Sequence, residues 1–213
     1  MGCDIHLYAE RLENGAWGYL PGCPDPGRNY ALYSILADVR NYHDLPVIAE
    51  PKGLPDDISE ELKNETAQEY DPEDEEWSDV WLGDHSFSWF TLRELLDFDW
   101  CQPCTRSGLI SVYDLFMWED YNRKLGESPK SWAVWAAGYK GVTEDEAHAI
   151  IERTEGTWRE KRDVLKRDYE RTMCQVDWTQ PLYKTCRCFW DTLMWLICQG
   201  DSEEVRIVFG FDN

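Results

Sequence analysis

Alternation of apolar and polar residues at the two ends of the chain predicts strands there. Residues 3–12 alternate between two faces, and the apolar face carries Cys3, Ile5, Leu7 and Ala9. A period of two is typical of a strand, because successive side chains point to opposite sides. The following Asn14-Gly15 predicts a tight turn into a second strand over 17–20. Residues 204–212 alternate in the same way. Each of these strands is therefore expected to have one apolar and one polar face.

Between the terminal strands, the apolar residues recur mostly at helical spacing. We expect helices over 31–41, 88–98, 112–125, 143–169 with a break near 156, and 181–199, together with strands over 105–111 and 173–178. Ser88 is the expected N-cap of its helix, and Thr143 with Glu146 has the spacing of a capping box. Strands at both ends with helices between them favour an α+β fold. We expect a mixed or antiparallel sheet that includes the N- and C-terminal strands, with helices packed against it.

The length of 213 residues predicts a single domain over 1–213. One segment departs from the amphipathic pattern. Residues 54–79 hold twelve Asp and Glu against the single Lys63, and we expect them to form an acidic excursion. Its most acidic stretch, 71–76, has the composition of a solvated loop.

The charge of the chain excludes some classes of partner. With 42 acidic and 21 basic residues the net charge is −21, which argues against direct contact with nucleic acid or an anionic membrane surface. No apolar run approaches the roughly 20 residues of a membrane span, and the N-terminus lacks the pattern of a signal peptide. We therefore expect a cytoplasmic protein. Its oligomeric state is left open, a homo-oligomer included.

Two close pairs among the eight cysteines raise the question of zinc. Cys101 with Cys104 and Cys186 with Cys188 would supply four thiolates. However, Cys186 and Cys188 fall inside a predicted helix, where residues two apart point in different directions. Buried free thiols are the preferred interpretation, and a structural zinc site is not expected.

Two of the four histidines lie beside aspartates and are candidates for chemistry. Asp4 and His6 are two apart on a strand, so they project from the same face with Cα atoms about 7 Å apart. Asp84 directly precedes His85. Such pairs bind a divalent metal or a phosphate, and His6 and His85 are also the candidate general base and acid. The alternative is an ordinary hydrogen-bonded pair on a polar surface.

A second group of candidates surrounds the predicted start of the helix at Ser88. Backbone N–H groups at a helix N-terminus favour an anion, which makes Ser86 and Ser88 candidate ligand contacts, and Trp89 adds an aromatic face. Simple helix capping explains Ser88 equally well.

A third group follows the Pro/Gly-rich loop over 21–27. Arg28 and Arg40 are candidates for binding a phosphate, and Tyr30 for stacking on a base. Surface ion pairs with the many carboxylates are the alternative interpretation for both arginines.

Five blocks of the sequence resemble a family of uncharacterised bacteriophage and prophage proteins. They are MGCDIH at 1–6, RNYALYSILADVR at 28–40, KGLPD at 52–56, DHSFSWFTLRELL at 84–96 and VRIVFGFDN at 205–213. The blocks contain Asp4, His6, Arg28, Tyr30 and the Asp84–His85 pair, and residues 102–171 are largely outside them. The family brings no established activity. What the resemblance implies is a phage setting, in which small accessory proteins commonly act on host defence.

Three functions are consistent with these observations. The first is an anti-defence protein that binds a small nucleotide-type ligand and sequesters a host immune signal, using aromatic and arginine side chains. The second is a phosphodiesterase that cleaves such a nucleotide, either with a divalent metal or with His6 and His85. The third is an acidic decoy that binds a host defence protein through its charge. We favour the first, because the chain has 12 Trp residues and resembles phage proteins.

Overall fold

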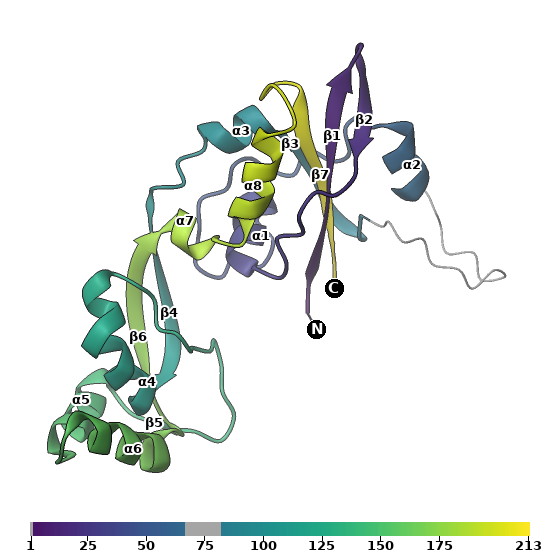
Figure 1. The fold of residues 1–213 in the computed structure, drawn as a ribbon. Coiled ribbons are helices and arrows are strands. Elements are labelled where there is room, and N and C mark those ends of the chain that lie inside the picture. Colours follow the sequence, from purple (N-terminus) through teal and green to yellow (C-terminus); the bar gives the residue numbers. More distant parts are fainter. Residues whose placement is uncertain (1, 67–81) are drawn as a thin grey trace. The chain divides into compact units, whose positions relative to one another are not determined.

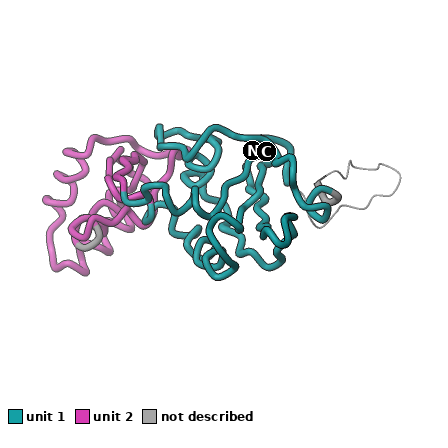
Figure 2. The backbone as a smooth tube through the Cα atoms, turned by 90° about the horizontal axis from the view of Figure 1, so that it is seen from above, with its two compact units in different colours: residues 1–101, 183–213 teal, residues 102–182 magenta. Residues whose placement is uncertain are grey.

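The computed structural model describes residues 2–66 and 82–213, which form two compact units (Figures 1 and 2). The first unit takes residues 1–101 and 183–213, and the second takes residues 102–182. The structure thus has an α+β fold, and the prediction of a single folding domain stays a prediction. Residues 67–79 of the expected acidic excursion lie outside the described residues.

The first unit is built on a four-stranded antiparallel sheet with the order β2-β1-β7-β3. Its strands are β1 (Asp4–Glu13), β2 (Ala16–Leu20), β3 (His85–Thr91) and β7 (Val205–Asp212). The predicted hairpin at Asn14-Gly15 is confirmed, and both residues have positive φ angles of 54° and 84°. The C-terminal strand β7 pairs with β1 along its whole length, so the two chain termini lie side by side (Figure 1).

Both faces of β7 are covered, including the more polar face that the alternation predicts. Every residue from Val205 to Phe211 is buried. On one face, the ring of Phe211 meets that of Tyr33 at 5.1 Å. On the other, Val208 packs with Leu62 and Leu82. Because β7 is a central strand covered on both sides, its polar residue Arg206 is buried as well, at 1% exposure.

Five helices accompany this sheet in the described part of the chain. They are α1 (Tyr30–Ala37), α2 (Glu60–Thr66), α3 (Leu92–Asp97), α7 (Leu182–Thr185) and α8 (Phe189–Ile197), of which α7 begins at the boundary between the units. The side chain of Asn29 caps α1 by accepting from two backbone N–H groups. The helix ends at Ala37, because Asp38 adopts the left-handed conformation. None of the described helices has the length and apolar character that crossing a membrane requires.

The predicted helix over 88–98 starts three residues too early. Residues 85–91 form the edge strand β3 against β7, and Thr91 caps α3 in a capping box with Glu94. The pairing with β7 satisfies the backbone of this segment, and the Thr91–Glu94 box then fixes the helix start. Ser88 is therefore no N-cap: it is fully buried, and its Oγ accepts from the backbone N–H of Lys52 at 3.1 Å.

The second unit contains a three-stranded sheet with the order β4-β6-β5, in which β5 and β6 are parallel. Its elements are β4 (Pro103–Ser111), α4 (Val112–Met117), the π-helical turn η1 (Trp118–Asn122), the 3₁₀ turn η2 (Arg123–Leu125), β5 (Lys140–Gly141), α5 (Glu144–Arg153), α6 (Trp158–Tyr169) and β6 (Thr172–Pro181). The predicted capping box of Thr143 and Glu146 is confirmed. A second box, Thr157 with Glu160, starts α6 just after the expected break at Gly156.

A buried ion pair links the strands of the first sheet. The Nε of Arg206 donates to Glu10 at 2.7 Å, and Glu10 is completely buried on β1. The Nη1 of Arg206 donates to Asp57 at 2.7 Å, and the guanidinium lies 3.9 Å from the ring centroid of Trp17 on β2. This guanidinium also holds the pKa of Asp57 below its usual value.

We predict that Gly83→Ala destabilises the first unit far more than Gly15→Ala. Both glycines have φ angles near +85°, so an alanine at either position costs about 1–2 kcal/mol of backbone strain. A Cβ at Gly83 would also lie 2.3 Å from the carbonyl oxygen of Phe211, whereas nothing lies within 4 Å at Gly15. This overpacking should add about 1–3 kcal/mol. Urea denaturation, monitored by circular dichroism, measures the free energy of unfolding of both variants. Equal losses of unfolding free energy would contradict the prediction.

We predict a large and recoverable loss of stability when the buried pair is broken. Arg206→Met leaves Glu10 buried without its partner and should cost about 3–5 kcal/mol of unfolding free energy, because an uncompensated charge is then buried. The double variant Glu10→Leu/Arg206→Met should regain most of this loss. The matched control Arg93→Met breaks an exposed pair with Glu203 and should cost about 1 kcal/mol or less. A double variant as unstable as the single one would show that the charge is not the cause.

Candidate functional site

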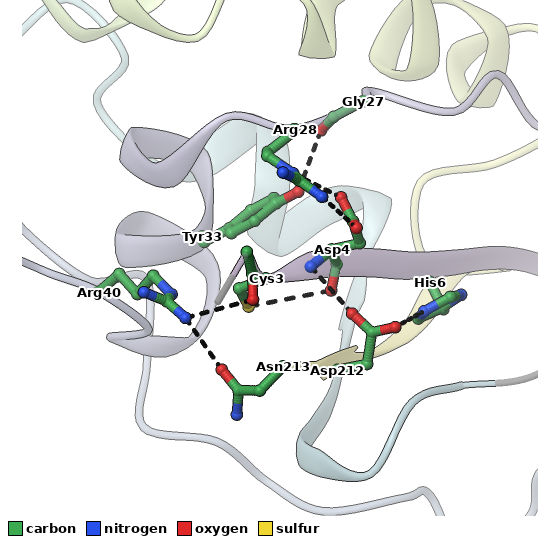
Figure 3. A network of polar contacts seen from close by, with 10 residues as sticks. Cys3, Asp4, His6, Gly27, Arg28, Tyr33, Arg40, Asp212 and Asn213 are labelled. Carbon is green, nitrogen blue, oxygen red and sulfur yellow. Dashed lines mark hydrogen bonds and ion pairs between the residues drawn. The ribbon is translucent and has the colours of Figure 1, made fainter. Parts of the chain in front are cut away.

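Side chains from five separate parts of the chain meet where β1 begins and β7 ends (Figure 3, in which all but His85 are labelled). We name this group the strand-end cluster: Asp4, His6, Arg28, Arg40, His85, Asp212 and Asn213. The antiparallel register of β1 and β7 creates it by placing Asp4 opposite Asp212. Five of its seven members were predicted from the sequence as site residues.

Arg28 and Asp4 form a two-pronged ion pair within the cluster. The Nε and Nη2 of Arg28 donate to the two oxygens of Asp4 at 2.7 and 2.5 Å (Figure 3). Because Arg28 donates to its carboxylate, the pKa of Asp4 is lowered. The backbone N–H of Asp4 donates to Asp212 Oδ1 at 3.0 Å, which joins this pair to the end of β7.

His6 and Asp212 form the second pair, at the other end of the same network. The Nε2 of His6 lies 3.4 Å from Asp212 Oδ2, and both side chains are about one quarter exposed. His6 also lines a pocket of about 210 Å³ together with Tyr19, Cys23 and Asp25. This volume is below the range of about 300–1,000 Å³ that is usual for whole-ligand sites. The pocket has room for a water molecule or one chemical group beside the imidazole.

Arg40 joins the cluster because it is not on a helix, contrary to the prediction. Helix α1 ends at Ala37, and Arg40 itself has a left-handed φ of 52°. Its Nη2 reaches the carbonyl of Gly2 at 3.3 Å and Asn213 Oδ1 at 3.1 Å. Its guanidinium carbon lies 5.4 Å from the ring centroid of Tyr30. Tyr30 therefore lies beside the cluster, with Arg40 over its ring.

His85 completes the cluster from the start of β3. Its Nε2 lies 2.9 Å from the amide nitrogen of Asn213, and its ring stacks on Phe211 at 6.0 Å. The Nδ1 lies 3.0 Å from the Oγ of Ser86, whose φ of 52° marks the irregular register between β3 and β7. Asp84 is 3.9 Å from His85 Nε2 and is more than half exposed.

Two predicted site residues lie elsewhere in the first unit. Ser88 is buried against Lys52, as described above. Trp89 lines a different cavity, of about 530 Å³, together with Trp17, Lys52 and Arg206. The Nζ of Lys52 lies 4.2 Å from the centroid of the Trp89 ring. The helix entrance that was expected at 84–88 is wrong, because these residues belong to or precede a strand, so no helix N-terminus favours an anion there.

Asp212 and Asn213 are the cluster members that sequence analysis missed. A signal was present: both close a block that resembles the phage family, and β1 and β7 were each predicted as terminal strands. Only their pairing register shows that Asp212 faces Asp4, and patterning alone does not set a register between strands some 200 residues apart.

A geometry suited to a metal ion lies outside this cluster. Among residues 2–66 and 82–213, the structure brings three ligand-type side chains together only at Glu119, Glu144 and His148, in the second unit. Within these described residues, no such group is formed by the four residues predicted as metal ligands, which are Asp4, His6, Asp84 and His85. Glu144 and His148 are four apart on α5, a spacing that was a usable signal in the sequence.

The cysteines are free thiols. Cys186 and Cys188 lie in the turn between α7 and α8, not inside a helix as predicted, and one is buried while the other is exposed. Cys101 is exposed at the end of the first unit's N-terminal segment, and Cys104 is buried on β4.

We predict that the Cys23 thiol beside His6 is a poor nucleophile. Burial, with a smaller contribution from the neighbouring Asp25, raises the pKa of Cys23 to about 12. Since the thiolate is the reactive form, Cys23 should be alkylated slowly at pH 8 and faster as the pH rises toward 12. Mass spectrometry after iodoacetamide labelling should find the exposed Cys101, Cys188 and Cys198 modified first. Rapid labelling of Cys23 would instead indicate an activated thiol at the pocket.

Comparisons of the chain with family models, curated proteins and solved structures give no match.

Proposed function

We propose that the strand-end cluster binds a small nucleotide-type ligand. The single observation that carries the proposal is the meeting of two arginines and two histidines from four remote segments at one end of the first sheet. An arginine with a purely structural role needs only one carboxylate as its partner, and no second arginine or histidine nearby. Recognition of a nucleotide requires cationic groups for its phosphate and aromatic groups for its base. Guanidinium, imidazole and aromatic groups converge here at exposed strand ends.

The arginines are the proposed phosphate contacts. A guanidinium has five N–H donors, and Asp4 takes two of those on Arg28. Asp4 thereby holds the Arg28 fork in a fixed orientation, which lowers the entropy that a ligand must remove. Arg40 lies on the other side of the start of β1 (Figure 3). Each arginine would donate charge-assisted hydrogen bonds to phosphate oxygens of the ligand on its own side of the strand.

The aromatic rings are the proposed base contacts. Tyr30 is only partly buried and already has a cation over its ring, and the ring of His85 is about one third exposed. Any planar base can stack on such rings, whichever base it is. In the phage setting that the resemblance implies, the ligand would be a nucleotide signal of host defence, and binding would sequester it.

The test is binding of a panel of cyclic nucleotides and ADP-ribose derivatives to the full chain. Titration calorimetry gives the affinity, and chromatography after heat denaturation shows whether the ligand is released intact. Arg28→Ala and Arg40→Ala should each weaken binding at least about tenfold, the value of one lost charge-assisted hydrogen bond. Arg93→Ala is the matched control, because Arg93 follows the opposite end of β3 and pairs with Glu203. No binding across the panel, or equal effects of Arg93→Ala and Arg28→Ala, would contradict the proposal.

The contact between His6 and Asp212 favours one alternative, hydrolysis of the ligand. Asp212 would orient His6 as the general base that takes a proton from water, and the water oxygen would attack phosphorus. The leaving oxygen of the phosphodiester would then receive a proton, for which His85 is the candidate acid. The same chromatography separates the two functions, because hydrolysis yields product. In that case His6→Ala should abolish product formation while the ligand still binds.

A further inference from the structure

A second polar cluster, independent of the strand-end cluster, lies in the second unit. Glu119, Glu144 and His148 each offer one ligand atom, and these atoms all lie within 4.8 Å of one another. The Nε2 of His148 is 2.8 Å from Glu119 Oε1. Octahedral ligands on an ion with bonds of about 2.1 Å are separated by about 3 Å when adjacent and about 4.2 Å when opposite. The observed spacing is therefore close to that of ligands on one ion.

Local backbone structure explains why these three side chains meet. Glu144 and His148 are four residues apart on α5, so they occupy the same face of that helix. Glu119 comes from the π-helical turn η1, where the extra residue per turn changes the direction in which side chains project. Such turns are rare and occur frequently at functional sites.

The cluster is already organised around a positive charge. The Nη1 of Arg123 donates to Glu119 at 2.7 Å and to Glu144 at 3.0 Å, so one cationic nitrogen lies between the two carboxylates. Arg123 is 41% exposed, and its guanidinium carbon lies 4.8 Å from the ring centroid of Trp118. An exposed, flexible side chain with an aromatic face beside it can move aside at low cost.

Space for further ligands adjoins the cluster. A cavity of about 530 Å³ is lined by Phe116, Glu119, Asp120, Arg123 and Lys124. Burial raises the pKa of Cys174 to about 11, and the charges of Glu144 and Glu119 contribute to the rise. Because Glu119 borders this cavity, an ion bound at the cluster has room for water ligands on that side.

We propose that Glu119, Glu144 and His148 bind a divalent first-row metal ion such as Mn²⁺, and that Arg123 gives up its place between the carboxylates when the ion enters. Two carboxylates and one imidazole suit Mn²⁺ and its neighbours, which take oxygen and nitrogen ligands. Water in the adjoining cavity completes the coordination. The inference does not depend on the nucleotide proposal, since it concerns other residues in the other unit.

The test is a titration of the full chain with Mn²⁺. Binding is measured as the loss of the electron paramagnetic resonance signal of free Mn²⁺. Mn²⁺ is the probe because it binds thiolates weakly, so the eight cysteines do not compete. The wild type should bind one ion. Arg123→Ala should bind it at least about tenfold more tightly, because a positive charge beside the ion is removed. Glu144→Gln/His148→Gln should lose this binding.

Two controls make the outcome decisive. Glu152→Gln changes an exposed carboxylate on α5 outside the cluster and should bind as the wild type does. Circular dichroism checks that the double variant is folded, and the Arg123→Ala result does not depend on that variant. Absence of stoichiometric binding by the wild type, no gain in Arg123→Ala, or full binding by a folded double variant would each overturn the proposal.

Discussion

The first unit depends on one buried charge, the guanidinium of Arg206 near the start of β7. A cation removed from water needs a close partner, and Glu10 on the neighbouring strand provides it without any exposure of its own. Asp57 and Trp17 close the remaining sides. Because both charges are costly if unpaired, only a register that places Glu10 opposite Arg206 is acceptable. The ion pair therefore selects the alignment of β1 with β7 among the alignments that apolar packing alone would tolerate.

That alignment has its consequence at the other end of the same strands. With Glu10 fixed opposite Arg206, Asp4 must come opposite Asp212, six residues away on each strand. The strand-end cluster is thus set by an interaction at the far end of the two strands. Residues with left-handed backbone, Arg40 and Ser86, then bring the chain segments on either side into the cluster. A left-handed backbone conformation at a residue other than glycine costs energy. Where it positions an arginine or a histidine in a cluster, a functional reason is the natural hypothesis.

The two units carry opposite chemistry in their polar clusters. In the first, guanidinium groups stand at exposed strand ends beside aromatic rings, an arrangement suited to an anion. In the second, two carboxylates and an imidazole surround a cationic nitrogen, an arrangement suited to a metal ion. The protein's own ion pairs have different roles in the two clusters. Asp4 holds Arg28 in place and leaves its other N–H donors to the ligand, whereas Arg123 occupies the position between Glu119 and Glu144 that the ion would take.

The sequence by itself determined the elements with a strong local signal. The terminal strands, the hairpin at Asn14-Gly15 and the capping box at Thr143 depend on neighbouring residues and were predicted from them. Five of the seven strand-end residues were also named, because scarce histidines and arginines beside aspartates stand out in an acidic chain. Tertiary structure decided the rest. Ser88 lies in a strand because β7 pairs with it, Arg206 is buried because β7 is covered on both faces, and Asp212 reaches His6 through a register across the whole chain. Each of these outcomes depends on contacts between residues far apart in sequence, and local periodicity carries no information about which distant segments will pair.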